Sequence, residues 1–248
     1  MSTWVLLRGL GREQRHWGAF PALLGEAVAA RRVVALDLPG NGQLNHLPSL
    51  TRVEAMAAWV DMELGRRALA PPYHVLALSL GAMVAVAWAQ SQPRALRAAV
   101  LINTSMRPFS PGYRRVRPSA LGAVLRSLAA AGDPARRERR VLALVSNKPE
   151  AIDAAYPQWL ACARENPVST VNVLRQLWAA ARFRARPEPP QVPLLVLTSA
   201  QDRMVHADCS RVLARQWGCS LAEHASAGHD LPLDDGPWVV RQVAHWLA

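Results

Sequence analysis

The chain has 248 residues, of which 51% are hydrophobic and 19% charged, so it can bury a large core and is not a disordered polymer. It contains no run of 18 or more apolar residues, and we therefore expect no membrane-spanning helix. The formal net charge is +11, with Lys148 as the single lysine. Because the cations lack the interleaved aromatic residues of nucleic-acid-binding segments, we expect no nucleic-acid partner. An arginine bias of this kind is more typical of a GC-rich genome than of a particular function.

The first part of the chain alternates short apolar runs with amphipathic helical patterns. We predict strands from the apolar runs at 4–7, 33–36, 74–78 and 98–102. Helices are predicted between them, with apolar stripes formed by Trp17, Phe20, Leu24 and Ala27 and by Val53, Met56, Val60 and Leu64. Because parallel neighbours need crossover connections, this alternation favours a mostly parallel sheet with helices on both faces.

The alternation stops between residues 106 and 188, where the pattern predicts helices alone. We expect these helices to start near Ser119, Asp133-Pro134, Lys148-Pro149 and Asn166-Pro167. The alternation then resumes with a strand at 194–198, a helix from about Ala207, a short strand at 220–223 and a closing helix from Trp238. The sequence therefore predicts one α/β core of about six strands, formed by 1–105 and 189–248, with a helical cap (106–188) inserted after the fourth strand.

A candidate nucleophile lies where the third predicted strand becomes a helix, in Ala77-Leu78-Ser79-Leu80-Gly81. A serine at such a sharp turn has strained dihedral angles, so its neighbours two residues away must be small. Ala77 and Gly81 meet this requirement. The turn also places Ser79 at the start of a helix, where free backbone N–H groups can stabilise an oxyanion.

Ser79 needs a base to remove its proton, and the position of His229 favours it among seven histidines. His229 lies in a loop between the last short strand and the last helix, over the carboxyl ends of the strands, where a parallel sheet places its ligand site. The alternatives are His16, His74 and His245, expected to be structural or solvated, His206 and His224 near the same edge, and His46, which chain order alone excludes.

A carboxylate that orients the base should follow a strand between Ser79 and His229. Asp202 does so, directly after the predicted strand at 194–198. A loop or capping role is the alternative for Asp202. Asp208 fits the first turn of the next helix better.

With these motifs in this order, the chain resembles the α/β-hydrolase superfamily over almost its whole length. The resemblance implies that Ser79, Asp202 and His229 form a catalytic triad and that no metal or organic cofactor is needed. It also implies that the backbone N–H groups of Leu10 and Leu80 stabilise the oxyanion.

Two features depart from the pattern of this superfamily. Arg8 precedes Gly9 in the oxyanion loop, where a histidine is more usual, so the support of that loop must differ. The first predicted strand matches the one that usually comes third, so we expect a shorter sheet. Neither departure touches the three catalytic candidates.

We expect a serine esterase that cleaves carboxylic esters of small or medium acyl groups through an acyl-enzyme, with a small-molecule ester as substrate. An alternative comes from the predicted cap, where 14 arginines and Lys148 stand against six acidic residues, a net charge of +9. An acidic acyl carrier protein with an ester- or thioester-linked cargo could dock there, as in the pimeloyl-carrier methyl ester esterases that the chain resembles in size and cap layout. The candidate docking residues are Arg114, Arg115, Arg117, Arg136, Arg137, Arg139 and Arg140. The least favoured hypothesis is that the protein binds a ligand without catalysing a reaction.

The expected location is the cytoplasm. Cys162, Cys209 and Cys219 show neither metal-ligand spacing nor a disulfide framework, as expected of reduced thiols. The N-terminus has no basic leader and no small-residue cleavage site, so no signal peptide is expected.

Overall fold

A computed structural model describes residues 2–129 and 132–248 and contains one six-stranded sheet. The strand order is β2-β1-β3-β4-β5-β6, and every pairing among these strands is parallel. The strands are β1 (Thr3–Leu7), β2 (Arg32–Leu36), β3 (Tyr73–Leu78), β4 (Leu96–Ile102), β5 (Leu194–Ser199) and β6 (Ser220–His224). The predicted parallel sheet is confirmed, and each predicted strand lies within two residues of the observed one.

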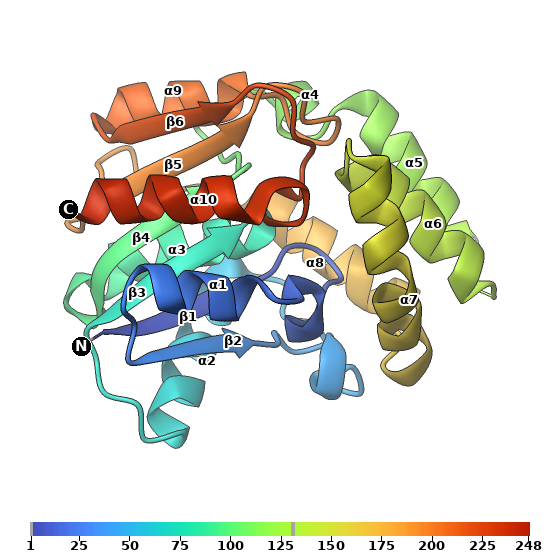
Figure 1. The fold of residues 1–248 in the computed structure, drawn as a ribbon, viewed down its shortest axis with the longest axis horizontal. Coiled ribbons are helices and arrows are strands. Elements are labelled where there is room, and N and C mark those ends of the chain that lie inside the picture. Colours follow the sequence, from blue (N-terminus) through green and yellow to red (C-terminus); the bar gives the residue numbers. More distant parts are fainter. Residues whose placement is uncertain (1, 130–131) are drawn as a thin grey trace.

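Helices cover both faces of the sheet (Figure 1). On one face lie α1 (Phe20–Ala27) and α10 (Leu231–Leu247), and on the other lie α2 (Val53–Arg66), α3 (Leu80–Ser91) and α9 (Asp208–Trp217). The side chains of β1 alternate between the two faces of the sheet. Trp4 and Leu6 pack towards α1 and α10, and Val5 and Leu7 pack towards α2 and α3. Because both faces of the central strands β1, β3, β4 and β5 are buried, these strands are nearly continuous apolar runs rather than alternating ones.

The segment between β4 and β5 is helical, as predicted, and lies beside the edge of the sheet to which the strand arrows point (Figure 1). Its helices are α4 (Gly112–Arg115), α5 (Pro118–Ala129), α6 (Pro134–Val145), α7 (Pro149–Glu165) and α8 (Thr170–Arg182). Leu142, Val145 and Trp159 form a small core of its own between α6 and α7. A β-bridge between Arg107 and Arg184 brings the two ends of the segment together.

Of the four predicted helix starts in this segment, Asp133-Pro134 and Lys148-Pro149 are confirmed and the other two need correction. Asp133 is the N-cap of α6 and accepts a hydrogen bond from the Arg136 N–H, as its position before Pro134 indicates. Ser119, by contrast, lies inside the first turn of α5, which starts at Pro118. Asn166 ends α7, and α8 starts later because the Ser169 side chain accepts a hydrogen bond from the Asn172 N–H. The Asn166-Pro167 pair therefore does not start a helix, and Ser169 caps α8 instead.

Two further helix predictions were wrong in their bounds. Trp17 belongs to a short 3-10 helix, Gln14–Trp17, and does not share a helix with Phe20. The closing helix begins at Leu231 rather than at Trp238 and is interrupted at Asp235, whose backbone is not helical. The Asp235 carboxylate accepts a hydrogen bond from the Trp238 N–H, so Asp235 caps the second half of α10.

Among the helices in 2–129 and 132–248, none combines the length and the apolar character needed to cross a bilayer.

Candidate active site

Ser79 occupies a strained turn between β3 and α3. Its backbone angles are φ +57° and ψ −114°, a region that residues with a side chain seldom adopt. The turn is held from both sides: the Ser79 N–H donates to the Ile102 carbonyl at 2.9 Å, and its carbonyl accepts from the Thr104 hydroxyl at 3.1 Å. At Gly81, a Cβ atom would lie 2.4 Å from the Leu7 carbonyl oxygen, so α3 can start this close to β1 only with glycine there.

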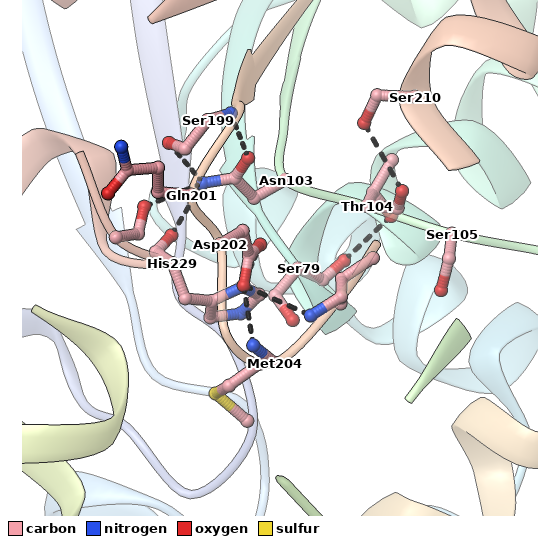
Figure 2. A network of polar contacts seen from close by, with 12 residues as sticks. Ser79, Asn103, Thr104, Ser105, Ser199, Gln201, Asp202, Met204, Ser210 and His229 are labelled. Carbon is pink, nitrogen blue, oxygen red and sulfur yellow. Dashed lines mark hydrogen bonds and ion pairs between the residues drawn. The ribbon is translucent and has the colours of Figure 1, made fainter. Parts of the chain in front are cut away.

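His229 and Asp202 are joined by a hydrogen bond of 2.7 Å between the imidazole Nδ1 and the carboxylate Oδ2 (Figure 2). Asp202 follows β5 and His229 lies between β6 and α10, so both reach the carboxyl edge of the parallel sheet. The other Asp202 oxygen accepts hydrogen bonds from the N–H groups of Met204 and Val205, at 2.7 and 3.0 Å. The carboxylate is therefore fixed with one oxygen turned towards the ring of His229.

The pKa of His229 is raised above its ordinary value. Burial alone would lower the pKa, but the negative charge of Asp202 and its hydrogen bond to the ring outweigh burial. Because the Asp202 carboxylate can only accept, Nδ1 carries the proton of the neutral ring. Nε2 is then free to take a proton from another group.

Asn103, directly after β4, holds the His229 loop in place (Figure 2). Its side-chain amide donates to the carbonyl oxygens of His229 and Gly228, at 2.8 and 3.3 Å, and to the Ser199 hydroxyl at 3.0 Å. Its carbonyl oxygen accepts from the Ser199 N–H at 2.8 Å. Asn103 was not among the site residues predicted from the sequence, although a polar residue directly after a buried strand is a usable signal.

Ser79 and His229 line one cavity of about 90 Å³. Gly9 and Leu10 pass directly beside the serine: a Cβ atom on Gly9 would lie 3.7 Å from the Ser79 Oγ. The helices between β4 and β5 close the cavity with apolar side chains, namely Val124, Val141, Leu144, Val145, Trp159 and Val173. Leu174 and Trp178 of α8, by contrast, are exposed and do not line the cavity.

The model of the alpha/beta hydrolase family matches residues 4–242, which is almost the whole chain. The chain belongs to the alpha/beta hydrolase family. A curated relative, the "Putative carbamate hydrolase RutD" of Klebsiella pneumoniae, is 29% identical to this hydrolase over 253 residues, covering 93% of this chain and 85% of that protein.

Solved structures of hydrolases share the fold. An esterase from Thermogutta terrifontis has 21% sequence identity and a TM-score of 0.75, covering 100% of this chain and 89% of that one. The esterase RhEst1 from Rhodococcus sp. ECU1013 has 20% identity and a TM-score of 0.78, with 99% and 90% covered. An enol-lactonase from Burkholderia xenovorans has 21% identity and a TM-score of 0.77, with 99% and 91% covered. Similarity at this level of identity establishes the fold of this hydrolase.

A buried ion pair that the sequence did not predict connects the two loops of the site. Arg8, in the loop after β1 that was predicted to supply an oxyanion donor, pairs through both terminal nitrogens with Asp230, the residue after His229. Their side chains are 3% and 2% exposed. The Arg8 guanidinium also stacks on Trp17, 4.7 Å from the ring centroid. Arg8 therefore anchors the loop after β1 through Asp230 and Trp17, at the position where the sequence departs from the pattern of the family.

Replacing Arg8 by methionine is expected to lower the free energy of unfolding by about 3–5 kcal/mol, because the Asp230 carboxylate is then left buried without a counter-charge. The measurement is urea denaturation at neutral pH. A matched control is Arg52→Met: Arg52 is 74% exposed and 3.7 Å from Glu54, so its loss should cost less than about 1 kcal/mol. Equal losses in the two variants would contradict a stabilising role for the Arg8–Asp230 pair.

One group of potential metal ligands occurs among the described residues, formed by Glu13, His16 and Cys162. These atoms already have partners: the protonated His16 Nδ1 donates to the Glu13 carbonyl at 3.2 Å, and the Glu13 carboxylate pairs with Arg15. Burial and the hydrogen bond to Glu13 raise the pKa of the Cys162 thiol to about 12. With Arg12 also 3.1 Å from the His16 Nε2, the surroundings favour a hydrogen-bonded network over a cation.

Proposed function

We propose that this protein is a serine esterase that cleaves carboxylic esters of small or medium acyl groups through a triad of Ser79, His229 and Asp202. The single observation that carries the proposal is the hydrogen bond of 2.7 Å between Asp202 and the His229 Nδ1, beside a strained serine that lines the same cavity. A hydroxyl, an imidazole and a carboxylate in this relation are the groups that acyl transfer needs.

In the proposed mechanism, the His229 Nε2 removes the proton of the Ser79 hydroxyl as its oxygen attacks the carbonyl carbon of the ester. The backbone N–H groups of Leu10 and Leu80 stabilise the oxyanion that forms, since Leu10 lines the cavity and Leu80 starts α3. The protonated His229 then gives its proton to the departing alcohol. Water, activated by the same ring, hydrolyses the acyl-enzyme.

We propose that residues 106–188 act as a cap that selects the acyl group. Side chains from α5, α6, α7 and α8 form most of the apolar wall of the cavity, and its volume of about 90 Å³ favours short chains. The names of the similar proteins, which include esterases, an enol-lactonase and a carbamate hydrolase, are compatible with attack on an activated carbonyl carbon.

Docking of an acidic acyl carrier protein on the cap has less support. Of the seven arginines considered for it, Arg115 is buried and donates to the carbonyls of Ala180 and Ala181, and Arg137 lines the cavity. Arg114 is paired with Asp208. Since Arg115 is buried, Arg137 lines the cavity and Arg114 already has an acidic partner, a small-molecule ester is the favoured substrate.

The proposal is tested with a fluorophosphonate probe, which phosphonylates an activated serine. We expect labelling of the native protein and its complete loss in Ser79→Ala, because only a serine with an adjacent base attacks the probe. Labelling that persists in Ser79→Ala would show that another residue is the nucleophile. If the native protein is not labelled, the proposed serine esterase activity is contradicted.

A further inference from the structure

Three arginines line the cavity that holds Ser79 and His229, namely Arg8, Arg12 and Arg137. A cavity with mostly apolar walls is an unusual place for so many cations, since each guanidinium loses part of its hydration there. Arg8 is neutralised by Asp230 within the same wall. Arg12 and Arg137 are 12% and 14% exposed and share a single acid.

That acid is Glu138, whose side chain is 1% exposed. Arg12 is close to it, with 2.6 Å between the Arg12 Nη1 and the Glu138 Oε2, whereas the Arg137 Nε is 3.5 Å from the Glu138 Oε1. Among the described residues, Glu138 is the one carboxylate within ion-pair distance of either guanidinium. Two positive charges therefore face one negative charge, and Arg137 is the less well paired of the two.

Glu138 lies outside the cavity that Arg12 and Arg137 line. Glu138 borders a separate small void of about 10 Å³, to which Arg12 and Arg137 also contribute. Arg12 and Arg137 therefore border both spaces, whereas Glu138 borders the void alone, and the Arg137 Nη1 donates to the carbonyl of Val168, which also borders the void, at 3.3 Å. Burial, together with the Arg12 charge, lowers the pKa of Arg137, as expected of an under-compensated cation.

His16 does not compensate the positive charge of Arg12 and Arg137. Its Nε2 lies 3.1 Å from the Arg12 Nη1, and its pKa is held well below the ordinary value by burial and by the charges of Arg12 and Arg8. The ring is therefore neutral and serves as an acceptor for Arg12. The local charge stays positive.

We infer that Arg137, together with Arg12, binds an anionic group of the substrate, so that the preferred substrates are short esters that carry a carboxylate. A carboxylate placed between the two guanidiniums would balance the charge that Glu138 leaves uncompensated and would accept charge-assisted hydrogen bonds. The apolar wall of Leu10, Val141 and Val173 would contact the short chain between this group and the ester. The inference rests on the proposed ester hydrolysis and adds the substrate class.

The test compares matched ester pairs by kcat/KM, measured as release of alcohol. In the first arm, monoethyl succinate, glutarate and adipate are each compared with the ethyl ester in which an isopropyl group replaces the carboxylate. In the second arm, acetate esters of short hydroxy acids are compared with acetates of the matching branched alcohols, which places the carboxylate on the alcohol side. We expect a preference of at least about tenfold for the anionic ester in one arm.

The variants identify the residue responsible. Arg137→Gln should bring the preference to within about threefold of parity, and Arg139→Gln, an exposed arginine of the same helix, should leave it unchanged. Glu138→Gln should increase the preference, because it removes the carboxylate that competes with the substrate. If Glu138→Gln does not fold, the comparison of Arg137→Gln with Arg139→Gln still tests whether Arg137 causes the preference for the anionic ester. A preference below threefold in both arms, or one that survives Arg137→Gln, would overturn the inference.

Binding distinguishes this inference from the proposed function. If no ester of either kind is hydrolysed and the serine probe does not react, ester hydrolysis fails as the function, and calorimetric titration with glutarate then decides on the anion site. Glutarate should bind the wild-type protein and the Ser79→Ala variant, and its affinity should fall at least about tenfold in Arg137→Gln. Equal binding by Arg137→Gln would overturn the anion site.

Discussion

Ser79→Ala is expected to lower kcat for ester hydrolysis by about a millionfold, the loss measured when a triad nucleophile is removed from a serine hydrolase. Without the hydroxyl, no acyl-enzyme forms, and the remaining rate comes from the oxyanion donors and substrate binding alone. The measurement is kcat on a p-nitrophenyl ester that the wild-type protein cleaves.

The Ser79→Ala variant should keep its fold, which makes the activity loss interpretable. The turn is held by the backbone of Ser79, through Ile102 and Thr104, and both of these hydrogen bonds survive the substitution. Its melting temperature should therefore stay close to that of the wild type. Ser105→Ala is a matched control, since Ser105 is a buried serine near the site whose hydroxyl donates to the Arg115 carbonyl. Retention of more than about one part in ten thousand of kcat by Ser79→Ala would contradict the proposed role.

Asp202→Asn is expected to lower kcat by about ten-thousandfold, because it reverses the proton arrangement of His229. In the wild type, one Asp202 oxygen accepts from the N–H groups of Met204 and Val205. An asparagine must keep its carbonyl oxygen there, which turns its NH₂ group towards the His229 Nδ1. That nitrogen then has to accept, so the ring proton moves to Nε2, which can no longer take the proton of Ser79.

The same substitution should also shift the pH dependence of the remaining activity. In the wild type, the rate should rise with pH through the raised pKa of His229, because the unprotonated ring is the active form. Asp202 supplies the charge and the hydrogen bond that raise this pKa, so in Asp202→Asn the pKa falls and the rising limb moves to lower pH. Asp208→Asn is the control, since Asp208 starts α9 and pairs with Arg211 and Arg114. If the rising limb of the pH–rate profile stays at the same pH, or if kcat falls by less than about tenfold, the proposed role of Asp202 is contradicted.

The sheet could be predicted from the sequence because its signals are local. Parallel strands covered on both faces must be apolar throughout, so the runs at 74–78 and 98–102 mark β3 and β4 without any tertiary information. The site candidates were found in the same way: Ser79 follows β3, and Asp202 follows β5. All parallel strands end at one edge, so residues that directly follow them are brought together.

Helix ends were less predictable, since a capping signal can be outweighed by packing. Asn166-Pro167 matches the pattern of a helix start, yet α8 begins at Thr170, where Ser169 supplies the cap. The Asp234 carboxylate, in the first turn of α10, accepts from the N–H groups of Asn147 and Gly228 and so joins the inserted helices to the His229 loop. Such contacts join residues far apart in the chain and leave no local pattern.

The sequence by itself determined the fold class, the strand positions and the three residues proposed for catalysis, because each depends on hydrophobic period or on position at a strand end. The tertiary structure alone decided what surrounds them. Arg8 and Asp230 are 222 residues apart, and Arg12 and Glu138 are 126 apart, so nothing in either neighbourhood reveals the pairing. Whether an arginine is a solvated surface charge or part of the cavity wall depends on burial and on its counter-charge, and both are set when distant segments pack together.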